Sequence, residues 1–242
     1  MKKSVGLKLI VFSFLLVAGS VAYSAPVIGS GTATGSTVAG VDNEATESYS
    51  SAFGNQNKAS GRNSSAVGYN NAATEINSSA VGLSNTATGM NSSAFGFNNT
   101  ATGVNSSAFG YQNEASGENS STVGLYNTAS GKNSSAFGSQ YKVTGEASGA
   151  FGVGKGTWNN ATNEFDYDYI NEGKNSYMFG NYNKIAAGTQ NNFILGNNVS
   201  IGSGINNSVG LGNGSTVSSS NEVSVGSATQ QRKITNVADG DV

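Results

Sequence analysis

Cysteine and histidine are absent from the 242-residue chain, and there is a single proline. Without cysteine there is no disulfide framework, and without histidine there is neither a zinc finger nor an imidazole-dependent catalytic triad. Only 11% of the residues are charged, which argues against the highly charged type of disordered chain. The 34 glycines follow no G-X-Y period, which excludes a collagen helix. An ordered fold must therefore account for the glycines.

The first residues have the pattern of a secretory signal peptide. Lys2, Lys3 and Lys8 give a basic start, residues 9–18 are apolar, and small residues precede a cleavage site that we place after Ser24. We therefore predict that residues 1–24 are removed and that the remainder is exported. Removing three of the 12 basic residues leaves 9 against 14 acidic residues, a net charge of −5. Such a surface does not attract nucleic acid or anionic lipid, so we expect no nucleic-acid partner.

An internal repeat of fourteen residues dominates the chain. Its unit is roughly N-S-S-A-[FV]-G-x-x-N-x-A-[ST]-G-x, and a second glycine column, which begins at Gly61, follows the first. The glycines of the first column stand at regular intervals: Gly40, Gly54, Gly68, Gly82, Gly96, Gly110, Gly124, Gly138 and Gly152. A period this constant indicates stacked structural units.

Fourteen residues suit two short strands and two turns. The S-A-F-G-x segment alternates as a strand does, and the second glycine with the following Asn-Ser pair supplies turn chemistry, since glycine tolerates positive φ. A helix would lose about 1 kcal/mol at each glycine, and the apolar columns lack a 3.6-residue period. The sequence predicts an all-β parallel solenoid of roughly ten to thirteen coils, about 50 to 60 Å long.

Two apolar columns run through these repeats. One holds Phe or Val just before the first glycine, such as Phe53 and Val67, and the other holds residues such as Tyr69 and Leu83 just after it. A thin coil cannot easily enclose both, and a continuous exposed apolar stripe marks an interface. We therefore expect a homo-oligomer. Strand alternation leaves open which column faces the coil interior and which faces the partner.

The repeat is interrupted after Gly152 and resumes with aliphatic residues at Leu195-Gly196, Val209-Gly210 and Val225-Gly226. These changes predict the following organisation: a signal peptide at 1–24, an N-terminal extension at 25–37, regular repeats at 38–152, an irregular insertion at 153–175, further repeats at 176–228 and a segment outside the repeat at 229–242.

The N-S-S-A-F-G units, the segment Ser224-Val225-Gly226-Ser227 and the terminal R-K-I-T-N-V resemble the head and neck of YadA-like trimeric autotransporter adhesins. Ser65, Ser79 and Ser93 stand where that family usually has an aliphatic residue. The resemblance implies a homotrimer of left-handed parallel β-rolls at the outer-membrane surface of a Gram-negative cell. It also implies virulence-related adhesion to host extracellular matrix proteins or cell-surface receptors, and cell–cell aggregation.

The sequence ends at Val242 within the neck motif, and we expect no membrane anchor in this chain. If the chain is complete as given, the product is expected to be secreted. The alternative hypothesis is a structural surface spacer or stalk component without a ligand of its own.

The insertion contains the candidate contact residues Trp158, Phe165, Tyr167 and Tyr169. Aromatic side chains dominate recognition hot spots, and loops on rigid scaffolds carry function. A local hydrophobic plug or a trimer contact would explain the same residues. The insertion is nevertheless the best candidate for a specific ligand contact.

Other residue patterns are weaker candidates. The alternating acids Glu164, Asp166 and Asp168 lack the glycine and bidentate glutamate of a calcium loop, so we expect no metal site. The remaining acids fall in variable columns, so we expect no catalytic residues, no cofactor and no enzyme activity.

The Asn-Ser-Ser segments satisfy the N-x-[ST] pattern for glycosylation, but hydrogen-bonded turn ladders explain them better. A further column of hydroxyl residues could present an array to ice or carbohydrate, although a solvated strand face is favoured. That column consists of Ser60, Thr74, Thr88, Thr102 and Ser116.

Overall fold

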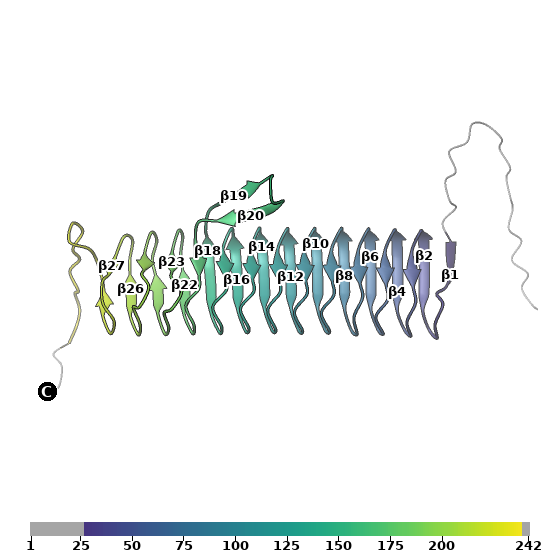
Figure 1. The fold of residues 1–242 in the computed structure, drawn as a ribbon, viewed down its shortest axis with the longest axis horizontal. Coiled ribbons are helices and arrows are strands. Elements are labelled where there is room, and N and C mark those ends of the chain that lie inside the picture. Colours follow the sequence, from purple (N-terminus) through teal and green to yellow (C-terminus); the bar gives the residue numbers. More distant parts are fainter. Residues whose placement is uncertain (1–26, 239–242) are drawn as a thin grey trace, which may run out of the picture.

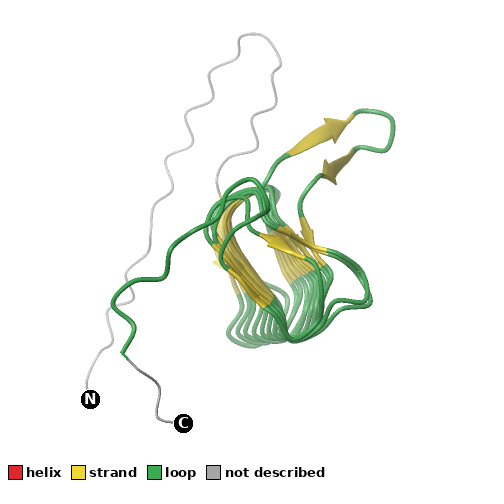
Figure 2. Ribbon diagram, turned by 90° about the vertical axis from the view of Figure 1, so that its left-hand side faces the viewer, coloured by secondary structure: helices red, strands yellow, loops and turns green. Residues whose placement is uncertain are grey.

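The computed structural model describes residues 27–238, and the chain there forms the predicted all-β parallel solenoid. No helix occurs in this range, and so none that could cross a membrane. The coils stack into a rod, from which one hairpin projects (Figure 1). Viewed along the rod, successive coils superpose, with the strands grouped on separate sides (Figure 2). The predicted signal peptide lies outside the described residues.

The longer strand of each coil belongs to a 14-stranded sheet. Its strands are parallel, except that β1 pairs antiparallel with β2 at the first coil. The strands are β1 (Val27–Ser30), β2 (Thr37–Val41), β4 (Ser51–Asn55), β6 (Ser65–Tyr69), β8 (Ser79–Leu83), β10 (Ser93–Phe97), β12 (Ser107–Tyr111), β14 (Ser121–Leu125), β16 (Ser135–Ser139), β18 (Gly149–Val153), β22 (Tyr177–Phe179), β24 (Phe193–Leu195), β26 (Val209–Leu211) and β28 (Val223–Ser224).

The shorter strands form a 12-stranded sheet, and the projecting hairpin is a separate two-stranded sheet. The hairpin consists of β19 (Gly156–Asn159) and β20 (Glu164–Tyr167). The short strands are β3 (Glu44–Ala45), β5 (Lys58–Ala59), β7 (Ala72–Ala73), β9 (Thr86–Ala87), β11 (Thr100–Ala101), β13 (Glu114–Ala115), β15 (Thr128–Ala129), β17 (Lys142–Val143), β21 (Ile170–Asn171), β23 (Lys184–Ile185), β25 (Ser200–Ile201) and β27 (Thr216–Val217).

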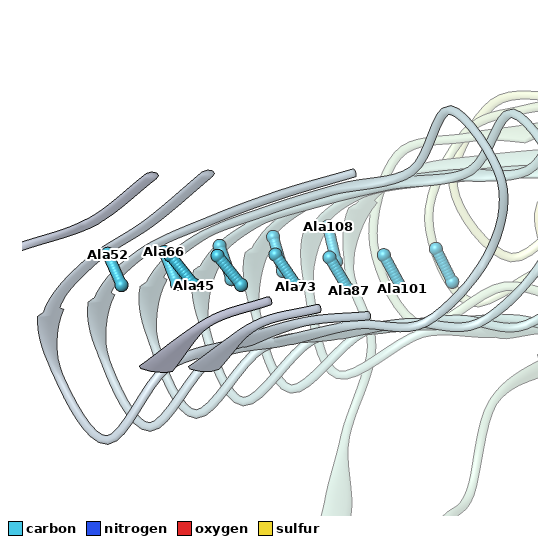
Figure 3. Packing of buried hydrophobic residues seen from close by; sticks show 11 residues of the cluster. Ala45, Ala52, Ala66, Ala73, Ala87, Ala101 and Ala108 are labelled. Atoms are coloured by element: carbon cyan, nitrogen blue, oxygen red, sulfur yellow. The ribbon is translucent and has the colours of Figure 1, made fainter. Parts of the chain in front are cut away.

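Alanine fills the interior of the regular coils. Strand β10 pairs with β12 in a register that places Ala94 beside Ala108, and the same register places alanine beside alanine from β4 to β12. A second alanine column comes from the short strands, and the two columns face each other between the sheets (Figure 3). Alanine buries little apolar area, so hydrophobic burial per coil is small and hydrogen bonding must contribute strongly.

An internal asparagine ladder supplies many of these hydrogen bonds. The Nδ2 group of Asn99 donates to the carbonyl oxygens of Phe95, at 2.9 Å, and of Gly110, at 2.7 Å. The Oδ1 atom of Asn99 accepts the backbone N–H of Asn113 at 3.1 Å. Each coil is thus bonded to the next through buried amides. The ladder comprises Asn57, Asn71, Asn85, Asn99, Asn113 and Asn127.

The two glycine columns have different roles, which corrects one detail of the sequence interpretation. Gly96 of the first column has a φ of 120°, outside the range that L side chains readily adopt. Gly61 of the second column does not have a positive φ, but a Cβ there would overlap the backbone of Glu75 in the next coil. The second glycine is therefore required for close approach between coils. The left-handed turn residue is the following asparagine, such as Asn63 with φ 57°.

An external asparagine ladder runs along these turns. Asn77 donates from Nδ2 to Oδ1 of Asn91 at 2.8 Å, and the same bond repeats from coil to coil. The amides of the Asn-Ser-Ser segments are therefore engaged with one another, as the turn interpretation expected. The hydroxyl column that begins at Ser60 follows the short strands on the solvent side, where its residues are half-buried or exposed.

The coils after the hairpin are wider than the sequence interpretation assumed. From β22 to β26 equivalent residues are separated by 16 positions, as in the bond from the Asn181 N–H to Oδ1 of Asn197. Strands β26 and β28 are again 14 residues apart, with Val209 beside Val223. Val209 consequently pairs with Phe193, and Gly210 with Ile194, so Val209-Gly210 is not equivalent to the earlier Phe-Gly pairs. Two residues added to the turns shift the register, and Leu211 takes the position beside Leu195.

Tyr141 maintains the ladder where the hairpin interrupts it. It occupies the position that follows Asn127, whose Oδ1 accepts the Tyr141 N–H at 3.2 Å. The buried phenol donates to the carbonyl of Gly180 at 2.9 Å and accepts the N–H of Asn183 at 3.1 Å. Burial raises the pKa of Tyr141 to about 12. One long side chain therefore spans the coil from which the hairpin departs.

Candidate binding surfaces

The outer face of the long-strand sheet carries both apolar columns. Because side chains alternate across a strand, the buried Ala94 places Phe95 and Phe97 together on the opposite face. The sequence left open which column is internal, and the structure shows that neither is. Phe109 and Tyr111, from the two columns of the next coil, remain 37% and 41% exposed. A single chain thus leaves an apolar face along the rod.

Stacked rings order this apolar face. The ring centroids of Phe95 and Phe109 are 5.2 Å apart with nearly parallel planes, at 12°. Phe151 stacks on Phe179 at 4.6 Å, so the column continues past the hairpin. Side chains that are already held in one arrangement lose less conformational entropy when a partner covers them. The face is therefore preorganised for a flat, repetitive contact.

The hairpin of β19 and β20 has an aromatic face and an acidic face. Trp158 lies opposite Phe165 in the hairpin register, and Tyr167 follows two residues later on the same side. Glu164 and Asp166 alternate with these rings along β20 and are exposed. Among residues 27–238, no group of three or more acidic side chains is arranged to hold a metal ion.

The aromatic face of the hairpin rests on the solenoid. Phe165 stacks on Tyr126 with ring centroids 4.8 Å apart and planes at 19°. The hydroxyl groups of Tyr167 and Thr128 are within hydrogen-bond distance, at 2.8 Å, and burial raises the pKa of Tyr167 to about 12. The Lys142 ammonium lies 5.9 Å from the centre of the Tyr167 ring, close enough for a cation–π contact.

The structure brings three of the four candidate contact residues together. Trp158, Phe165 and Tyr167 line one groove between the hairpin and the coils. Tyr169 does not line it and instead lies 5.4 Å from Tyr182, measured between ring centroids.

The groove has a volume of about 480 Å³, and most of its wall comes from solenoid residues that sequence reasoning did not select. Those residues include Gln112, Glu114 and Tyr126. They occupy ordinary repeat columns, and only the direction in which the hairpin folds makes them part of a site. No local sequence signal identifies that direction.

Comparison with known families identifies the repeats. The YadA head domain repeat matches residues 45–71, 73–99, 101–126 and 123–140. The regular coils between residues 45 and 140 therefore match the YadA head repeat. Among solved structures, the chain is similar to the collagen-binding domain of the Yersinia adhesin YadA, with 21% identity, 78% of each chain covered and a TM-score of 0.40. A search of curated proteins gives no match.

The matched YadA head repeats end before the hairpin. Residue 140 is the last one matched, whereas β19 begins at Gly156. The buried asparagine ladder from Asn57 to Asn127 lies within the matched repeats, whereas the apolar face begins there and continues past the hairpin. The groove combines both regions, because Gln112 and Glu114 come from the matched segments and Trp158 comes from the hairpin.

Proposed function

We propose that the chain is the head of an exported cell-surface adhesin that attaches bacteria to host extracellular matrix or cells and to one another. The observation that carries this proposal is the run of YadA head repeats between residues 45 and 140. The fold suits the task, because a rod of equivalent coils presents the same side chains many times along its length. Many weak contacts to a fibrous target then give high avidity without a deep pocket.

We further propose that three copies associate through the outer face of the long-strand sheet. The apolar side chains that the narrow coils bury are mainly alanines, so most of their large apolar side chains are left on that face. Covering a large apolar side chain stabilises an assembly by about 1.5–3 kcal/mol. A homotrimer places the stacked Phe and Val column of each copy against the others, and the polar turns with their Asn ladder remain in solvent.

Binding of the purified mature chain, residues 25–242, to immobilised fibrillar collagen and to cultured host cells tests the adhesive role. We expect saturable binding that is lost when Phe95 and Phe109 are both replaced by serine, because this breaks the multivalent assembly. The matched control, Met90→Ser with Val104→Ser, changes exposed turn residues and should retain binding. Trimers that bind neither collagen nor cells would favour the spacer role instead.

A further inference from the structure

The groove beneath the hairpin has two unlike walls. Trp158 and Phe165 form one wall from the hairpin, and the other comes from the outward residues of β11, β13, β15 and β17. The hairpin lies along the rod over these coils rather than pointing straight away from it (Figure 1). The contacts of Phe165 with Tyr126 and of Tyr167 with Thr128 hold it there. The groove is therefore built by packing.

The wall that comes from the solenoid coils is polar, and some of its hydrogen-bonding groups have no partner. Glu114 lines the groove and is exposed, and its carboxylate has no ion-pair partner among the described residues. Gln112 also lines it, and its Oε1 atom is buried without a hydrogen-bond partner. Unpartnered buried oxygens are uncommon in folded proteins, because each loses its hydrogen bonds to water without a replacement. The exposed carboxylate of Glu114 can accept an O–H or N–H donor from a ligand.

The aromatic wall offers a flat apolar surface next to these acceptors. Trp158 remains 38% exposed although Phe165 and Tyr126 lie beside it. An indole ring of this kind can stack against the C–H face of a pyranose, while neighbouring amides and carboxylates bind the ring hydroxyls. Asn98 and Asn163 add two further amides to the lining.

We propose that this groove binds a neutral saccharide. Its volume of about 480 Å³ lies within the range of about 300–1,000 Å³ that is typical of small-ligand sites. Glu114 and Glu164 outnumber Lys142, the single cation of the lining, which disfavours an anionic ligand. The carboxylate and amide groups disfavour a wholly apolar ligand, because it would leave them desolvated and unpaired.

Saccharide binding in the groove is a separate proposal from attachment of the trimer to matrix or cells, and each can be tested without the other. Attachment to collagen depends on assembly through the long-strand face, whereas the saccharide depends on Glu114 and Trp158. Substitutions in the groove can therefore abolish sugar binding while collagen binding persists, and failure of either proposal is distinguishable from failure of the other.

The experiment measures binding of the mature chain to lactose, maltotriose, cellotriose and diacetylchitobiose by calorimetry, with sialyllactose and a heparin disaccharide as acidic probes. We expect at least one neutral probe to bind and the acidic probes to bind more weakly. Glu114→Gln and Trp158→Ala should each raise Kd by about tenfold or more, because they remove a charged acceptor and the stacking surface.

Two control variants distinguish a binding role from a structural one. Trp158→Phe keeps an aromatic ring and should stay within about threefold of the parent Kd. Asp168→Asn removes a charge from the hairpin outside the groove and should leave Kd unchanged. Absence of binding to all four neutral probes would overturn the proposal. So would a preference for the acidic probes, or neutral binding that neither Glu114→Gln nor Trp158→Ala weakens.

Discussion

The coils before and after the hairpin fill their interiors with side chains of different size. Before the hairpin, neighbouring coils are 14 residues apart and enclose alanine, as at Ala94. After it, from β22 to β26, residues 16 apart are equivalent, and the interior contains Met178, Ile194 and Ile201. Two additional residues per coil thus accompany a larger enclosed volume. The length of a coil and the size of its interior side chains have to change together.

Hydrogen bonding changes with coil width as well. The narrow coils bond through an unbroken ladder of buried asparagines from Asn57 to Asn127. In the wide coils Asn183 still donates to the carbonyl of Gly196 at 2.7 Å, but the next ladder position is the buried Val199. We infer that amide bonding holds the narrow coils together and that aliphatic packing takes over part of this role in the wide ones.

Removing an interior side chain from a wide coil should have the largest effect. Ile194→Ala is expected to lower the free energy of unfolding by about 2–5 kcal/mol, because it deletes buried methyl groups and leaves a cavity. Chemical denaturation followed by circular dichroism measures the change. Ile76→Ala, at an exposed turn of a narrow coil, should cost about 0.5 kcal/mol or less. Equal losses at the two sites would contradict the assigned interior.

Removing a ladder amide tests the narrow coils. Asn99→Ala should lower the free energy of unfolding by about 1–3 kcal/mol, because it leaves the Gly110 carbonyl and the Asn113 N–H without their partners. The matched substitution Asn105→Ala removes a member of the exposed ladder and should cost less, since water replaces the lost bonds. A larger loss at Asn105 than at Asn99 would show that the buried ladder is not the main support.

A larger interior side chain in a narrow coil tests whether coil length and interior volume are linked. Ala73→Ile should destabilise the protein by about 1–3 kcal/mol, because the narrow interior has no room for the larger side chain. Ala72→Ile changes the neighbouring residue of β7, which points outward, and should lie within about 0.5 kcal/mol of the parent. Thermal unfolding of the pair measures the difference. Tolerance of isoleucine at position 73 would disprove the link between coil length and interior volume.

The smallest effect is expected at high pH. Tyr141 and Tyr167 each have a pKa of about 12, raised by burial from the value of about 10 in an unfolded chain. The folded state holds these protons more tightly, so the stabilisation is complete below pH ~10 and is lost as the pH rises towards ~12. Trp158, the only tryptophan, reports on the hairpin by fluorescence, and circular dichroism reports on the solenoid.

The two tyrosines should affect these signals differently. Tyr167→Phe should change the alkaline transition seen by tryptophan fluorescence and leave the solenoid signal nearly unchanged. Tyr141→Phe should change the solenoid signal, because its phenol bridges Gly180 and Asn183. Identical shifts of both signals in the Tyr167 variant would contradict the assignment of Tyr167 to the contact between the hairpin and the solenoid.

The constant glycine period allowed the solenoid, its two strands per coil and its asparagine turns to be predicted from sequence. The alternation of side chains along the long strand could not show from sequence which face is interior. The enclosed residue is alanine, which is small for a core residue. The register after the hairpin was also missed, since Val209-Gly210 imitates the earlier motif while two added turn residues shift the pairing to Leu211. The groove depends on a tertiary contact between Tyr126 and Phe165, which lie on separate elements.

The mass of the mature chain in solution tests the central claim, that the apolar face is covered by identical copies. Sedimentation equilibrium of residues 25–242 should give three times the mass of the chain. The Phe95→Ser and Phe109→Ser double variant should shift the equilibrium towards monomer while keeping its β-sheet content. A parent protein that remains a folded monomer at all measured concentrations would contradict the account.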